Sequence, residues 1–231
     1  MELSEHFQEL RSRLLICLAC FAVVASIAFY QFPFLWRFVE LPLLGTDLVT
    51  LVNLSPAESI SVSLLVACMM AALATSPIFL YHAYAFCAPA VPEGRKKTFL
   101  FSVLASSLLF FTGAAFAYIF AIPFLFSFLA GFSNSAMQMW SQTSYVSFLF
   151  RFEVLFALIF QMPVAAAFLG RTGIAGKDFL LKHFRLVIFL TALFSAIVTP
   201  PDLISLFWIA IPMIILYGIS LITYRLAWRT R

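Results

Sequence analysis

Long uninterrupted apolar runs dominate the chain and restrict what it can fold into. A helix needs about 20 apolar residues to cross a hydrocarbon layer of about 30 Å. Of the 231 residues, 64% are hydrophobic and 10% are charged, so a water-soluble fold could not bury the apolar surface. We expect an all-α membrane protein, a single polytopic domain over residues 1–231 with six spans. The predicted spans are 14–35, 59–82, 99–122, 145–169, 186–199 and 203–224.

The fifth run is shorter than the others. Its 14 residues, Leu186 to Thr199, give a helix of about 21 Å, which is less than the hydrocarbon thickness. The sequence Thr199-Pro200-Pro201-Asp202 follows as a tight turn. We therefore expect the bilayer to be thinned around the hairpin of the last two spans.

The basic residues favour one side of the membrane. Twelve of the 14 Lys and Arg lie before the first run, between the second and third, between the fourth and fifth, and after the sixth. The other two are Arg37 and Arg151. By the positive-inside rule, both termini face the cytoplasm or its equivalent. The uncharged segment 123–144, which contains Trp140, is expected to lie along the opposite membrane interface.

Prolines recur within the runs or at their edges, and each removes a backbone donor and tends to kink its helix. Kinked spans favour a concave arrangement over a regular bundle. The prolines concerned are Pro33, Pro77, Pro123, Pro163 and Pro212.

The chain carries no common catalytic or phosphate-binding motif. It has no H-E-x-x-H, no G-x-S-x-G and no Gly-rich phosphate loop. No set of His, Cys and carboxylate residues has the spacing of metal ligands. We expect neither enzyme activity nor a metal or cofactor, and the lack of an internal repeat argues modestly against a secondary transporter.

Polar residues inside a membrane are costly and usually functional, and here they concentrate in the fourth run. Arg151 and Glu153 are about 200° apart on a regular helix and cannot pair with each other. Gln161 lies about 80° around from Glu153 and about 12 Å along the helix, with Ala157 and Ala165 on the same broad face. This stripe of polar and small residues fits either a helix-packing face or a water-filled cavity. A small-solute or ion transporter using Glu153 is the alternative function.

Two carboxylates lie among the cations of the inner segments. Glu9 precedes Arg11, and Glu93 lies in the loop 92–97 beside three basic residues. Solvation or local ion pairing would explain them, since exposed pairs contribute at most about 1 kcal/mol. A cationic partner would explain them equally, because Arg binds carboxylates in a bidentate manner.

A set of short motifs follows in order along nearly the whole chain: His6 to Arg13, Ser76 to Tyr81, Phe86 to Pro89, Ser106 to Phe110, Phe160 to Pro163, and Thr199 to Asp202. Together they resemble the motifs of the TatC family of twin-arginine protein translocases. The resemblance implies six helices in a concave, glove-like arrangement with both termini cytoplasmic and the last two spans short.

The resemblance also implies a function. A member of this family would act as the core receptor for twin-arginine signal peptides and would assemble with TatA- and TatB-like subunits and further copies of itself. Export of folded proteins would be driven by the proton motive force, without nucleic acid and with membrane lipids as surroundings. The membrane would be a bacterial cytoplasmic membrane or a thylakoid or organellar membrane of that lineage. A purely structural scaffold is the remaining alternative.

The resemblance assigns roles to particular residues. Signal-peptide binding would fall to Glu9, Arg11 and Glu93. Contacts with partner subunits inside the membrane would fall to Glu153 and Gln161, although the family usually has Glu where Gln161 stands, and Gln cannot titrate. Organisation of the outer face would fall to Pro42 and Asp202.

Overall fold

The structure, a computed structural model, describes residues 3–43, 49–87, 96–131, 138–172, 176–198 and 203–229. The chain divides into two compact units. One comprises Met1–Ser107 and Ile122–Phe150, and the other comprises Leu108–Ala121 and Arg151–Arg231. Apart from two four-residue strands, the described elements are helices, as the apolar runs predict.

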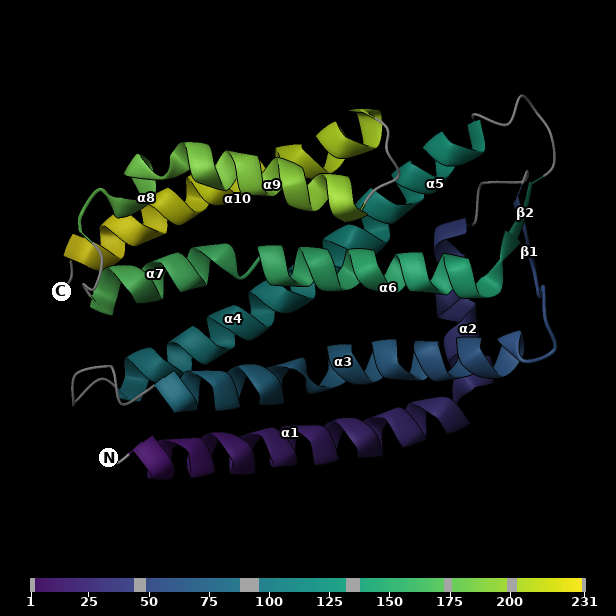
Figure 1. Cartoon of the computed structure of the whole chain (residues 1–231), viewed down its shortest axis with the longest axis horizontal. Coiled ribbons are helices and arrows are strands. Elements are labelled where there is room, and N and C mark those ends of the chain that lie inside the picture. The colour runs from purple at the N-terminus through teal and green to yellow at the C-terminus, as the bar shows by residue number, and fades with distance from the viewer. Residues whose placement is uncertain are drawn as a thin grey trace. The chain divides into compact units, whose positions relative to one another are not determined.

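In the first unit, α1 (Leu3–Tyr30) and α3 (Glu58–Cys87) pack side by side and run in opposite directions (Figure 1). The N-terminal end of α1 therefore lies beside the C-terminal end of α3. A short helix, α2 (Phe32–Glu40), follows α1 and also packs on α3. The chain turns at Gln31, whose carbonyl accepts the N–H groups of Phe34 and Leu35 at 3.0 and 3.1 Å.

A two-stranded parallel sheet, which the apolar pattern did not predict, completes the first unit. β1 (Val49–Val52) pairs with β2 (Gln138–Ser141) in a register that places Val49 opposite Gln138. Trp140 lies in β2, where its indole N–H donates to Gln138 Oε1 at 2.8 Å and its ring contacts Phe126. Part of the segment predicted to lie along the interface is thus a strand, and its depth in a membrane stays a prediction.

Four further helical segments follow α3 along the chain. These are α4 (Lys96–Phe116), a π-helical segment (Ala117–Ala121), α5 (Ile122–Gly131) and α6 (Gln142–Ile159). The last four helices are α7 (Met162–Thr172), α8 (Phe179–Lys182), α9 (Phe184–Val198) and α10 (Leu203–Arg229). Both α4 and α6 begin in the first unit and end in the second.

Glycines allow close helix packing in the second unit. A Cβ on Gly170 of α7 would lie 2.7 Å from the carbonyl oxygen of Tyr224 in α10. A Cβ on Gly113 of α4 would lie 2.6 Å from the carbonyl oxygen of Phe156 in α6. Because nothing larger than a hydrogen fits at either position, small residues set these helix–helix distances.

The prolines act in different ways. α6 ends at Ile159 and α7 begins at Met162, so the helix is interrupted just before Pro163. The π-helical segment directly precedes α5, which has Pro123 as its second residue. α3 continues through Pro77, and the Ser76 hydroxyl donates at 2.7 Å to the Leu73 carbonyl that Pro77 cannot reach. α10 likewise continues through Pro212.

Within the described residues, five helical stretches are long and apolar enough to cross a membrane. They are Phe7–Tyr30, Glu58–Phe86, Leu100–Gly131, Gln142–Arg171 and Phe207–Arg229. The fifth apolar run forms α9, whose 15 residues give about 22 Å, so the predicted span at 186–199, and with it the total of six, stays a prediction. The glove-like shape, the N-in and C-in topology and the single domain also stay predictions.

We expect Gly170→Ala to lower the free energy of unfolding by about 1–3 kcal/mol, because the added methyl group overlaps the α10 backbone. The matched control is Gly218→Ala in α10, where a Cβ meets nothing within 4 Å. That change should be neutral or stabilising by up to about 1 kcal/mol. Equilibrium unfolding in detergent measures both, and equal effects would contradict the close packing.

Candidate functional site

The N-terminal end of α1 carries an ion pair that reaches α3. Glu9 Oε1 accepts hydrogen bonds from Arg13 Nε at 2.9 Å and from Arg13 Nη2 at 2.6 Å. Arg13 Nη1 lies 3.5 Å from His82 Nδ1, near the C-terminal end of α3. The guanidinium group of Arg13 thus contacts both its own helix, at Glu9, and α3, at His82. The local pair of Glu9 is with Arg13, one helical turn away, and Arg11 is exposed to solvent.

One oxygen of Glu9 is left without a partner. Its Oε2 atom is buried and has no hydrogen-bond partner within the described part of the chain. A carboxylate oxygen can accept up to two further hydrogen bonds, so this atom is available to a donor that reaches it. Glu93, predicted to act with Glu9, lies outside the described residues.

Glu153 lies in α6 among aromatic residues of the second unit. It is 4% exposed, and its neighbours in sequence and one turn on, Phe152 and Phe156, are fully buried. Its Oε2 atom has no hydrogen-bond partner among the described residues. Tyr118, in the π-helical segment, lies within electrostatic range of the carboxylate. π-Helical turns inside α-helices are frequent at functional sites.

Gln161 lies at the interruption between α6 and α7. Its N–H donates to the Leu158 carbonyl at 3.0 Å, and its side-chain amide donates to the Ala157 carbonyl at 3.4 Å. The predicted stripe from Glu153 to Gln161 assumed one continuous helix, whereas the structure has an interruption between Ile159 and Met162. Ala157 is buried whereas Ala165 is exposed, so these two alanines do not share an environment.

Pro42 is buried in the 3₁₀ segment Leu41–Leu43, which packs against α2 and α5. Nearby in sequence, the Val39 carbonyl accepts a hydrogen bond from the Tyr145 hydroxyl at 2.5 Å, which ties α2 to the start of α6. Asp202, the other predicted outer-face residue, lies outside the described residues.

Glu58, the first residue of α3, was not among the predicted site residues. Its Oε1 atom accepts hydrogen bonds from the Ser141 hydroxyl at 2.5 Å and the Thr143 N–H at 3.0 Å. Its Oε2 atom accepts the Leu54 N–H at 2.5 Å. One buried carboxylate therefore joins the start of α3, the end of β2 and the start of α6.

A signal for Glu58 was present in the sequence. Ser55 to Glu58 has the S-x-x-E spacing of a helix-capping box. The Glu58 N–H bonds to the Ser55 carbonyl at 3.1 Å, as expected at a helix start. The partners Ser141 and Thr143, more than 80 residues away, could not be read from that local spacing.

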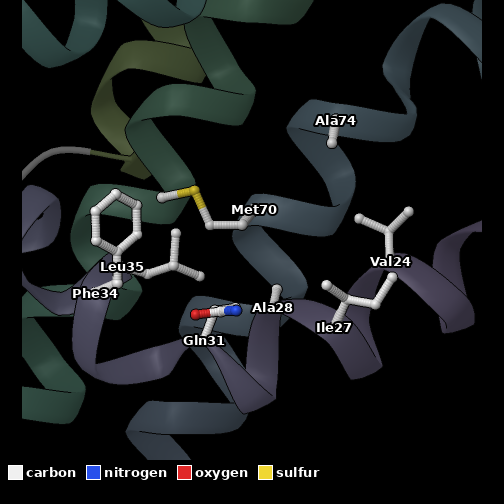
Figure 2. Close-up of a pocket in the computed structure, with 8 residues that line it drawn as sticks. All are labelled: Val24, Ile27, Ala28, Gln31, Phe34, Leu35, Met70 and Ala74. Atoms are coloured by element: carbon white, nitrogen blue, oxygen red, sulfur yellow. The ribbon is translucent and has the colours of Figure 1, made fainter.

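A groove of about 570 Å³ lies along one face of α1, α2 and α3 in the first unit (Figure 2). Its lining is apolar except for Gln31, whose side chain is exposed at the turn between α1 and α2. Ala28 and Ala74 leave room from opposite helices. The lining residues are Val24, Ile27, Ala28, Gln31, Phe34, Leu35, Met70 and Ala74.

Comparison with known proteins identifies the family. The family model described as Sec-independent protein translocase protein (TatC) matches residues 5–212. The chain belongs to the TatC family. It is 33% identical over 222 residues to TatC of Helicobacter pylori, covering 96% of this chain and 86% of that protein. It is 32% identical over 235 residues to TatC of Aquifex aeolicus, covering 100% and 98%.

Solved structures agree. A crystal structure described as that of the twin arginine translocase receptor TatC superposes with a TM-score of 0.86 at 31% identity. The match covers 98% of this chain and 100% of that one. TatC proteins are multi-pass membrane components of a protein translocase, and the family is one of transport proteins rather than catalysts.

In this TatC protein, Glu58→Gln should loosen the segments that the carboxylate joins. The amide nitrogen of Gln would face a backbone N–H that now donates to an oxygen, so at least one buried donor loses its acceptor. We expect faster amide hydrogen exchange at Leu54 and Thr143 and a lower thermal unfolding midpoint. Glu40→Gln is the matched control, because Glu40 is exposed and, among the described residues, accepts a local hydrogen bond from Trp36 at 2.6 Å. Equal exchange in both variants would rule out the joining role.

Proposed function

We propose that this chain is the core receptor subunit of a twin-arginine translocation system. It binds twin-arginine signal peptides through Glu9, Arg11 and Glu93 and scaffolds assembly with TatA- and TatB-like subunits. Folded proteins are exported with the energy of the proton motive force. The observation that carries the proposal is the buried Glu9 Oε2 atom. It lacks a hydrogen-bond partner in the described part of the chain, whereas Oε1 accepts two hydrogen bonds from Arg13.

The chemistry of an arginine side chain suits this acceptor. A guanidinium presents several N–H donors in a rigid plane and bonds carboxylates in a bidentate manner, whereas a Lys ammonium is a point charge on a flexible stem. An incoming Arg can bond Oε2 while Arg13 keeps Oε1, or can replace Arg13, whose Nη1 atom already lies 3.5 Å from His82 Nδ1. Such an arrangement would favour Arg over Lys.

The related crystal structure described as a twin arginine translocase receptor supports this assignment, because it matches the chain over 98% of its length. The positive-inside pattern supports placing both termini, and hence Glu9, on the cytoplasmic side. In this topology α9 is the fifth of six spans, short enough to thin the bilayer.

Within the membrane, Glu153 and Gln161 would serve contacts with single-span partner subunits. Gln161 lies where the helix is interrupted, and interrupted helices expose backbone groups that partners can satisfy. Pro42 and Asp202 would organise the outer face, and the protein would function as a homo-oligomer within the complex. The membrane would be a bacterial cytoplasmic membrane or a thylakoid or organellar membrane of that lineage.

Site-specific photocrosslinking tests the receptor assignment. Probes placed beside Glu9, Glu93 and Gln161, so that these three side chains are kept, are exposed to a precursor with the Arg-Arg pair or with Lys-Lys. We expect crosslinks at Glu9 and Glu93 that vanish with Lys-Lys, because Lys cannot form the bidentate bond. Equal or absent crosslinks would refute the receptor role. Solute uptake by proteoliposomes containing this chain alone would instead favour the transporter alternative.

We expect Glu9→Gln to weaken binding of a twin-arginine peptide by about tenfold or more, because a charge-assisted hydrogen bond becomes a neutral one. Glu40→Gln in the same unit removes an equal charge from an exposed carboxylate and should leave binding unchanged. Peptide titration against the purified protein in detergent measures both. The same loss in both variants would show a general charge effect and would count against a specific site.

A further inference from the structure

One end of the second unit gathers its cations. Among the described residues of this unit, six of seven Lys and Arg lie where α7 ends, around α8, and where α10 ends. Figure 1 shows these three helix ends together within the unit. Asp178 is the one described acidic residue there. The six cations are Arg171, Lys177, Lys182, Arg185, Arg225 and Arg229.

The segment Gly176–Arg185, here called the basic segment, is held against α10 by two tyrosines. The Tyr224 hydroxyl donates to the Gly176 carbonyl at 2.8 Å. The Tyr217 hydroxyl donates to the Leu180 carbonyl at 2.6 Å. Because these bonds go to the main chain, they fix the path of the segment and leave the side chains of its cations exposed.

Aromatic rings are exposed between the cations of the basic segment. Phe179 is 40% exposed and Phe184 is 43% exposed. The Arg185 guanidinium carbon lies 5.9 Å from the centre of the Phe184 ring, within the range of a cation–π contact. Exposed aromatic residues interleaved with Lys and Arg are typical of segments that lie at a membrane interface.

We propose that the basic segment, with the ends of α7 and α10, binds the headgroups of anionic phospholipids. Lys177, Lys182 and Arg185 contact the phosphates, while Phe179 and Phe184 enter the boundary with the acyl chains. The charge is complementary to anionic lipid, and each Lys or Arg near such a surface strengthens binding by about fivefold. A signal peptide with two arginines would be repelled here, so this surface is distinct from the Glu9 site.

Trp228 provides a local probe, because it lies in α10 beside Arg229 and stacks on Tyr224 at 6.4 Å. The full chain, with Trp36, Trp140 and Trp208 replaced by Phe, is titrated in neutral detergent with brominated phosphatidylglycerol or brominated phosphatidylcholine. We expect phosphatidylglycerol to quench Trp228 at a lower concentration. Replacing Lys177, Lys182 and Arg185 together by Gln should weaken that quenching by about 100-fold.

The controls separate a lipid surface from general charge effects. Arg151→Gln removes the one described cation of this unit that lies elsewhere, and it should leave quenching unchanged. Lys182→Arg should also leave it unchanged, and single Gln variants carry the test if the triple variant does not fold. Equal quenching by the two lipids, or an unchanged triple variant, overturns the proposal. Displacement of the lipid by inorganic phosphate at similar concentration overturns it in favour of a free-phosphate site.

Discussion

The structure depends on one constraint, that backbone polar groups have no water to bond inside a bilayer. Helices satisfy it along most of the chain, and side chains help where helices are interrupted or contain proline. The Ser76 hydroxyl bonds the carbonyl that Pro77 leaves in α3. The Thr223 hydroxyl of α10 bonds the Pro163 carbonyl at 2.9 Å, where α7 begins. The Thr223 bond therefore satisfies the backbone and also joins α7 to α10.

Outside the helices the constraint is met differently. Two non-helical segments pair as β1 and β2, and the carboxylate of Glu58 accepts two further backbone N–H groups and a hydroxyl. A carboxylate suits this place because its oxygens accept several bonds and its charge is favourable at the N-terminus of α3. Glu9 and Glu153, by contrast, each keep one oxygen without a partner in the described part of the chain. Three glutamates thus divide into one that holds structure and two that retain capacity for a ligand.

The pattern of apolar runs and prolines predicted the helices better than it predicted the contacts between distant segments. Apolar runs and prolines are local, so they indicated the long helices and the interruption near Pro163. The β1–β2 pairing and the bonds of Glu58 join positions more than 80 residues apart, and no local period encodes such contacts. Glu9 was predicted as a signal-peptide-binding residue. Its pairing with Arg13, and the contact of Arg13 with His82, are seen only once α1 is packed on α3. For Glu153 and Gln161, the predicted shared face rested on one continuous helix, and the interruption between α6 and α7 could not be located from the apolar pattern alone.

A receptor for a cationic peptide on the positive side of a membrane faces a problem of charge. The cations that predict the topology would repel such a peptide and attract anionic lipid, and a binding carboxylate must not be neutralised by these cations. In the first unit, Arg13 is held by Glu9 and His82 together, which limits it to one oxygen of the carboxylate. In the second unit, Asp178 is the one described acidic residue at the end that carries the basic segment. The separation of the segment's cations from acidic residues leaves them to lipid phosphates, and under our proposals the acceptor at Glu9 stays open to the guanidinium of a signal peptide.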